Sequence, residues 1–139
     1  MKTIPVSIVI PYKEVDGDIK IWMQVRKSLD DLSGRLEFPG GKIEKNETPK
    51  LAAIREVEEE VGVKIKESSL QLASIYNDKF DDKIISIYVF IHRNEDSFDS
   101  SALNGHWYGL KERDSFWSKM PPANQVFLGE ILEAVKSNT

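Results

Sequence analysis

The sequence contains no cysteine, no long apolar run and no excess of basic residues, and each absence excludes a class of protein. Without cysteine, disulfides and thiolate metal sites are excluded, so a bound metal would need oxygen or imidazole ligands. Nowhere do about 18 apolar residues occur together, and the first residues do not resemble a secretory leader. The 19 Lys and Arg against 23 Asp and Glu give a net charge of -4, which provides no field that would attract long nucleic acids. We therefore expect a cytoplasmic protein that binds neither membranes nor long nucleic acids.

The chain does contain enough apolar material for one core. Its 139 residues, of which 40% are hydrophobic, lie within the usual range for one compact domain. There are no internal repeats and no low-complexity segments. The sequence thus predicts a single domain over residues 1–139, which we expect to be a monomer.

Alternating apolar and polar residues predict a β-sheet in both halves of the chain. Residues 4–10 and 19–25 alternate on either side of Asp16-Gly17-Asp18, which is typical of a β-hairpin. Further strands are predicted at residues 36–38, 70–76, 84–91 and 107–110.

The end of the chain predicts a helix that packs against this sheet. It begins near Pro122 and carries apolar residues at helical spacing, namely Leu128, Ile131, Leu132 and Val135. Before it, the polar segment 94–104 contains few apolar residues and is predicted to be a long flexible loop.

Another helix, predicted over residues 49–61, has the clearest boundaries in the chain. Thr48 is a suitable N-cap, and Pro49 suits the first helical position. Gly62 suits the residue after the last turn, because glycine readily takes the left-handed conformation that ends many helices.

Three glutamates share one face of this helix. At about 100° per residue, Glu56, Glu59 and Glu60 lie together. The residues predicted to face the core on the opposite side are Leu51, Ile54, Val57 and Val61. Like charges at this spacing, close to the negative end of a helix, are unfavourable, so we expect a positive group nearby.

Two interpretations explain this acidic face. It could be an ordinary solvated surface, relieved by Arg55, Lys64 or Lys66. Alternatively, the carboxylates could hold a hard divalent cation such as Mg²⁺ or Mn²⁺, which prefers oxygen ligands and also binds phosphate oxygens.

The spacing around the helix matches a known pattern and favours the second interpretation. Gly41 is followed after five residues by Glu47, and after seven more by the run Arg55-Glu56-Val57-Glu58-Glu59-Glu60-Val61-Gly62-Val63. This resembles the Nudix box, G-x5-E-x7-R-E-U-x-E-E-x-G-U with U a bulky aliphatic residue, and every defining position is filled. The preceding run, residues 36–44, is similar to the corresponding run of MutT-type members of that family.

The resemblance implies an α/β (α+β) fold, namely a Nudix-type α/β/α sandwich with a mixed β-sheet between helices. It also implies hydrolysis of a nucleoside diphosphate linked to another group, with Mg²⁺ or Mn²⁺ as cofactor. By position, Glu56, Glu59 and Glu60 become the catalytic metal ligands, and the Gly40 carbonyl becomes a further ligand. Glu56 is the first choice as general base, although a loop acid could take that role.

Three other residues have less direct roles by the same resemblance. Glu47 and Arg55 belong to the box, and a salt bridge that braces the loop against the helix would explain both. Lys42 follows the glycine pair closely enough to reach a phosphate, although an exposed lysine is an equally ordinary interpretation.

The resemblance also suggests a base. Pro121-Pro122-Ala123-Asn124 is similar to the segment with which MutT-type members recognise 8-oxoguanine, since an amide both donates and accepts hydrogen bonds. Arg26, Phe80 and Lys83 fall where those members have residues near the substrate. Taken singly, Asn124 could be a helix cap, the two cations surface charges, and Phe80 a core or loop contact. Together they favour a purine nucleoside triphosphate.

Two positions depart from the family pattern. Ser101 stands where MutT-type members have a glutamate that assists the metal, so the extra loop ligand is left open. Acidic residues in the same loop are Glu95, Asp96 and Asp99. His106 precedes Trp107 where an acidic residue is common, and we assign no catalytic role to His106 or His92.

We therefore expect hydrolysis of 8-oxo-dGTP, or of a related nucleoside triphosphate, to the monophosphate and pyrophosphate, which would clear damaged precursors before DNA synthesis. One alternative is a Nudix hydrolase for CTP, methylated CTP or a dinucleotide polyphosphate. Another is a nucleotide sensor without turnover, although the presence of all three box carboxylates argues against it.

Overall fold

The predicted hairpin forms the centre of the sheet. The computed structural model describes residues 1–26, 34–100 and 103–137. Its first two strands are β1 (Lys2–Val15) and β2 (Asp18–Val25). Between them, Asp16 and Gly17 take φ values of 52° and 78°, the left-handed conformations that a two-residue turn needs to match the twist of its strands. The hairpin is thus confirmed, with a first strand longer than predicted.

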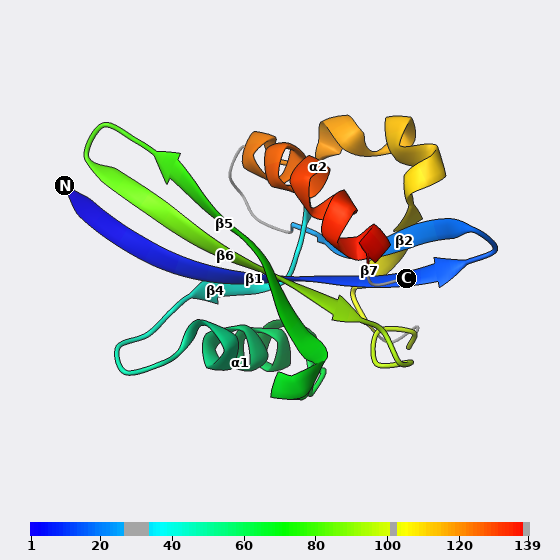
Figure 1. Ribbon diagram of the computed structural model, residues 1–139, viewed down its shortest axis with the longest axis horizontal. Coiled ribbons are helices and arrows are strands. Elements are labelled where there is room, and N and C mark those ends of the chain that lie inside the picture. The colour runs from blue at the N-terminus through cyan, green and yellow to red at the C-terminus, as the bar shows by residue number, and fades with distance from the viewer. Residues whose placement is uncertain (27–33, 101–102, 138–139) are drawn as a thin grey trace.

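The remaining strands extend this hairpin into a mixed sheet (Figure 1). They are β3 (Leu36–Glu37), β4 (Gly40–Lys42), β5 (Leu70–Lys79), β6 (Lys83–Arg93) and β7 (Gly105–Gly109). The order is β3-β2-β1-β6-β5, with β4 also paired to β1 and β7 to β2. β1 runs parallel to β6 and antiparallel to β2 and β4. All predicted strands are present, whereas β4 was not predicted from the sequence.

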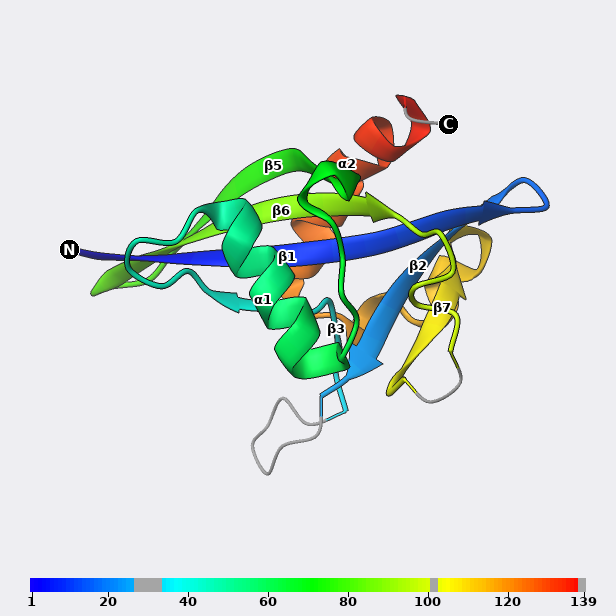
Figure 2. The same cartoon turned by 90° about the horizontal axis from the view of Figure 1, so that it is seen from below.

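Two helices cover opposite faces of the sheet. α1 (Pro49–Val61) lies on one face and α2 (Pro122–Ser137) on the other (Figures 1 and 2). Because side chains alternate along a strand, Val9 joins the core under α1 while Ile10 joins the core under α2. The predicted α/β/α sandwich around a mixed sheet is therefore confirmed. Short 3₁₀ helices cover Glu67–Ser69, Leu110–Ser115 and Trp117–Lys119.

The α1 side of the sheet has a core built around Trp22. The centroid of its ring lies 5.0 Å from that of Phe98, and both side chains are fully buried. Phe98 belongs to the segment predicted to be a flexible polar loop. Its backbone N–H donates to Asn94 Oδ1 at 3.0 Å, and burying a phenylalanine contributes about 1.5–3 kcal/mol. This part of the loop is consequently anchored to the core.

Both predicted ends of α1 are confirmed. Thr48 Oγ1 accepts a hydrogen bond from the Leu51 backbone N–H at 3.1 Å. Gly62 takes a φ of 81°, and its N–H donates to the Glu58 carbonyl at 2.9 Å. A residue with a Cβ would be strained at this left-handed position.

The side of α1 that faces the sheet differs from the predicted one. The buried residues are Ala52, Ala53 and Val57, whereas Leu51 is 46% exposed. The two alanines allow the helix to approach the sheet closely, which turns Leu51 toward solvent. The prediction that Leu51 faces the core was wrong.

The apolar stripe predicted for α2 is described in part. Leu128 is buried in the core under α2, and Leu132 is half-buried. The side chains of Ile131 and Val135 lie outside the described residues.

Among the helices in the described part of the chain, none is long and apolar enough to cross a membrane.

Candidate active site

Two glycines bring the segment before α1 into close contact with its neighbours. Gly40 pairs with Ile8 of β1, and a Cβ at this position would collide with the carbonyl oxygen of Ser7. A Cβ on Gly41 would collide with the carboxylate of Glu56. Since only glycine lacks a Cβ, this pair lets β4 lie directly between β1 and a carboxylate of α1.

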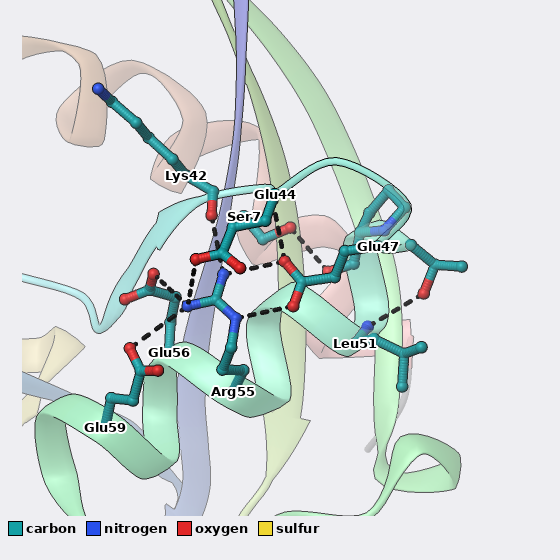
Figure 3. A network of polar contacts seen from close by, with 10 residues as sticks. Ser7, Lys42, Glu44, Glu47, Leu51, Arg55, Glu56 and Glu59 are labelled. Carbon is teal, nitrogen blue, oxygen red and sulfur yellow. Dashed lines mark hydrogen bonds and ion pairs between the residues drawn. The ribbon is translucent and has the colours of Figure 1, made fainter.

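Arg55 joins the same segment to α1 (Figure 3). Its Nε and Nη2 donate to the two carboxylate oxygens of Glu47 at 2.7 and 2.9 Å, which is a bidentate pair. Nη2 also donates to the Lys42 carbonyl at 3.0 Å. Nη1 donates to Glu56 at 2.9 Å and to Glu59 at 3.3 Å. One guanidinium thus contacts the loop and two of the three helix carboxylates, and the hydrogen bonds to Glu47 raise its pKa.

The Glu47 carboxyl is strongly stabilised in its charged form. Hydrogen bonds from Arg55, and a further one of 3.0 Å from the Glu44 backbone N–H, lower its pKa from 4.5 to about 2. When folding lowers the pKa of a carboxyl, that carboxyl stabilises the folded state at pH values above its pKa in the unfolded chain. That stability is lost as the pH falls toward the folded pKa.

Glu47 should therefore steepen the acid sensitivity of the protein. Between pH 4.5 and about 2, the melting temperature of the wild type should fall more steeply than that of Glu47→Gln, whose amide does not titrate. Glu44→Gln is the matched control, because Glu44 belongs to the same loop and approaches Arg55 only at 3.8 Å. Thermal unfolding followed by circular dichroism measures the slopes, and identical slopes for wild type and Glu47→Gln would contradict the role of this ion pair.

The three glutamates of α1 have different surroundings. The Glu56 side chain is 16% exposed and that of Glu59 is 60% exposed. Glu60 accepts a hydrogen bond of 2.8 Å from Gln24 Nε2. Partial removal of water from its carboxyl raises the pKa of Glu60, and the Gln24 amide opposes that rise. Among the described residues, no three Asp, Glu or His side chains are close enough to form a ready-made metal site. Arg55 engages Glu56 and Glu59, and Gln24 engages Glu60.

A pocket of about 330 Å³ lies beside Glu60. It is lined by Gln24, Val25, Arg26, Glu37, Phe38, Gly40, Glu60 and Asn104. On its wall, Arg26 Nη1 donates to Glu37 Oε1 at 3.0 Å. The pocket therefore brings together three residues predicted from the sequence, namely Arg26, Gly40 and Glu60, and combines both signs of charge with amide groups.

Residues 1–126 match the family described as the NUDIX domain. The chain is also 32% identical over 116 residues to an 8-oxo-dGTP diphosphatase of Haemophilus influenzae, and this alignment covers 81% of this chain and 82% of that protein. The chain belongs to the Nudix family. A CTP pyrophosphohydrolase of Escherichia coli is 39% identical over 49 residues, or 35% of this chain and 36% of that protein. The crystal structure of a MutT protein from Methanosarcina mazei Go1 aligns with a TM-score of 0.72 at 19% identity, covering 97% of this chain and 96% of that one.

As a Nudix hydrolase, the protein acts on phosphoric anhydride bonds. Hydrolases of this family generally use divalent metals and nucleotide substrates. The oxygen donors at the site, three carboxylates and the Gly40 carbonyl, are chemically suited to a hard divalent cation. Because Glu56 and Glu59 contact Arg55, a cation would compete with this guanidinium for their oxygens.

Four of the residues predicted to bind substrate, namely Lys42, Phe80, Lys83 and Asn124, do not line this pocket. Lys42 is exposed, and its side chain points away from the carboxylates (Figure 3). Phe80 is exposed in the turn between β5 and β6, with Lys83 Nζ 5.4 Å from its ring centroid. Asn124 lies half-buried in the first turn of α2, past the cap position. The substrate contacts assigned to these four residues stay predictions. Ser101, where the loop ligand was left open, lies outside the described residues.

The sequence did not identify three polar residues of the pocket, namely Gln24, Glu37 and Asn104. A signal existed for Gln24, because it stands near the end of β2, two positions before Arg26, and side chains two apart along an extended segment lie on the same face. Glu37 belongs to the run of residues 36–44, which resembles MutT-type members over its whole length and so does not single out this residue. Nothing local marks Asn104, which only the tertiary fold brings to this pocket.

Proposed function

We propose that the protein is a metal-dependent nucleoside triphosphate pyrophosphohydrolase that converts 8-oxo-dGTP to 8-oxo-dGMP and pyrophosphate. The observation that carries this proposal is the set of three carboxylates on α1, Glu56, Glu59 and Glu60, the last of which lines a pocket together with Arg26. The choice of substrate is supported by the similarity to the Haemophilus influenzae 8-oxo-dGTP diphosphatase, which extends over most of both chains.

In this proposal, Glu56, Glu59, Glu60 and the Gly40 carbonyl hold Mg²⁺, with Mn²⁺ as a substitute. When bound, the cation supplies charge neutralisation at the phosphates. Glu56 is half-buried beside Gly41 and accepts a proton from the attacking water. Oxygen from that water is added to phosphorus, the anhydride between the α and β phosphates is broken, and pyrophosphate leaves.

Base recognition is assigned to Asn124, whose amide both donates and accepts hydrogen bonds on a purine edge. Arg26, at the pocket beside Glu60, is proposed to contact the nucleotide. Lys42, Phe80 and Lys83 are proposed as further substrate contacts. These assignments require the substrate to extend beyond the pocket, because Lys42, Phe80, Lys83 and Asn124 do not line it.

A second candidate substrate is CTP, which the similarity to the Escherichia coli CTP pyrophosphohydrolase supports over a shorter stretch. This alternative keeps the same carboxylates and the same bond cleavage. It differs only in the base, so the two candidates share one experiment.

That experiment incubates the protein with Mg²⁺ and a panel of 8-oxo-dGTP, dGTP, CTP, 5-methyl-CTP and a dinucleotide polyphosphate. Release of pyrophosphate, orthophosphate and monophosphate is measured for each compound. We expect 8-oxo-dGTP to give monophosphate and pyrophosphate, with the highest kcat/KM of the compounds in the panel. Orthophosphate as the sole product would contradict the proposed cleavage, and comparable kcat/KM for dGTP and 8-oxo-dGTP would contradict the proposed specificity.

Asn124→Ala should lower the preference for 8-oxo-dGTP over dGTP, measured as the ratio of their kcat/KM values, by about tenfold. The reason is that the bound base would keep a polar edge without a hydrogen-bond partner, which costs about 1–3 kcal/mol of binding. The Mg²⁺ concentration for half-maximal turnover should not change, since no contact joins Asn124 to the α1 carboxylates in the part of the chain that the structure describes. Val126→Ala is the matched control, since Val126 is exposed two positions along the same helix. An unchanged ratio for Asn124→Ala would remove this residue from base recognition.

A further inference from the structure

Gln24 has a rigid backbone next to the helix carboxylates. It lies near the end of β2, where it pairs with Glu37 of β3 on one side and with Gly105 of β7 on the other. Its side chain lies on the face of the sheet that α1 covers, as does that of Trp22 two positions earlier, and Nε2 donates to Glu60 Oε2 at 2.8 Å. A side chain on a strand that is paired on both sides is well suited to hold another group in place.

Glu60 differs from the other two box carboxylates in the charge of its partner. Glu56 and Glu59 both contact the cationic Arg55. Within the part of the chain that the structure describes, no ion pair forms at Glu60, and its side-chain partner is the neutral amide of Gln24. An amide occupies one of roughly four lone-pair positions of a carboxylate and leaves its negative charge uncompensated. Glu60 is thereby oriented while its charge stays available to a cation.

We propose that Gln24 is a positioning residue that orients Glu60 for a divalent cation at the pocket. The proposal rests on the proposed metal-dependent hydrolysis. Gln24, Glu60 and Gly40 line the same pocket, so the amide holds the carboxylate on a wall to which Gly40 also belongs. A hydrogen bond that fixes a ligand carboxylate before the cation arrives strengthens metal binding, and loss of such a bond typically costs tenfold or more in affinity.

The experiment compares wild type with Gln24→Met, which keeps the length of the side chain and removes its donor. Mn²⁺ binding without nucleotide is measured from the electron paramagnetic resonance signal of free Mn²⁺, and Mg²⁺ is titrated against turnover. Both metal affinities should fall by about tenfold. Raising Mg²⁺ should restore turnover of Gln24→Met toward that of wild type, because the carboxylate itself is retained.

Gln71→Met is the matched control, because it removes the same amide from an exposed position on β5 and should leave both metal affinities unchanged. Melting temperatures of both variants check the fold, and Gln24→Ala serves as a second variant if methionine disturbs β2. An unchanged Mn²⁺ affinity in the Gln24 variants, or no Mn²⁺ binding by the wild type, would overturn the proposal. A raised KM with unchanged metal affinity would also overturn it and make Gln24 a substrate contact.

The Mn²⁺ measurement separates this proposal from the proposed function. If the wild type binds Mn²⁺ and hydrolyses none of the panel nucleotides, the proposed substrate is wrong, while the Mn²⁺ affinities of the variants still decide the role of Gln24. If the panel is hydrolysed and Gln24→Met binds Mn²⁺ like wild type, only the role of Gln24 is wrong.

Discussion

Glu59→Gln is expected to lower kcat by about two to three orders of magnitude while leaving the fold intact. The Glu59 side chain is 60% exposed, and its contact with Arg55 Nη1 is a single one of 3.3 Å. Exposed pairs of this kind contribute about 0–1 kcal/mol to stability, so the melting temperature should change little. The amide keeps the size of the side chain but removes the charge that a divalent cation requires.

The measurement is steady-state turnover at several Mg²⁺ concentrations, together with thermal unfolding. Glu58→Gln is the matched control, because this neighbour is also an exposed glutamate of the same helix turn and contacts Lys64 at 3.8 Å rather than Arg55. Its kcat should stay within about twofold of wild type. Equal activity in the two variants would show that position 59 holds no catalytic metal.

The ends of α1 and the spacing of its carboxylates could be predicted because the signals are local. Thr48 caps the helix through a residue three positions away, and Gly62 ends it through its own backbone conformation. The bidentate contact between Glu47 and Arg55 likewise joins residues eight positions apart. None of these contacts depends on how distant strands are arranged.

The features that escaped prediction depend on tertiary packing. Leu51 is exposed because Ala52 and Ala53 face the sheet, a rotation of α1 that its own hydrophobic pattern does not specify. Phe98 looked like one apolar residue in a polar loop, and its role follows from contact with Trp22, which is 76 positions earlier in the chain. The pocket shows the same limit, because Asn104 and Gln24 meet there only through the pairing of β7 with β2.

Arg55→Met is expected to lower kcat by about a hundredfold and also to lower the melting temperature, which distinguishes it from Glu59→Gln. Methionine keeps the unbranched stem of arginine but none of the donors that reach Glu47, Glu56, Glu59 and the Lys42 carbonyl. The loop then loses its connection to α1, and two carboxylates lose the cation that separates them. Both effects displace the groups proposed to hold the metal.

A double-mutant cycle with Glu47→Gln identifies which of these contacts matters for stability. If the bidentate pair carries the effect, Arg55→Met should lower the melting temperature less in the Glu47→Gln background than in wild type, because the partner is already neutral. Arg55→Lys should lie between wild type and Arg55→Met, since lysine keeps the charge but cannot form the planar fork. Additive losses would assign the stability of the site to the contacts with Glu56 and Glu59 instead, and unchanged turnover in Arg55→Met would contradict any role for this residue in arranging the carboxylates.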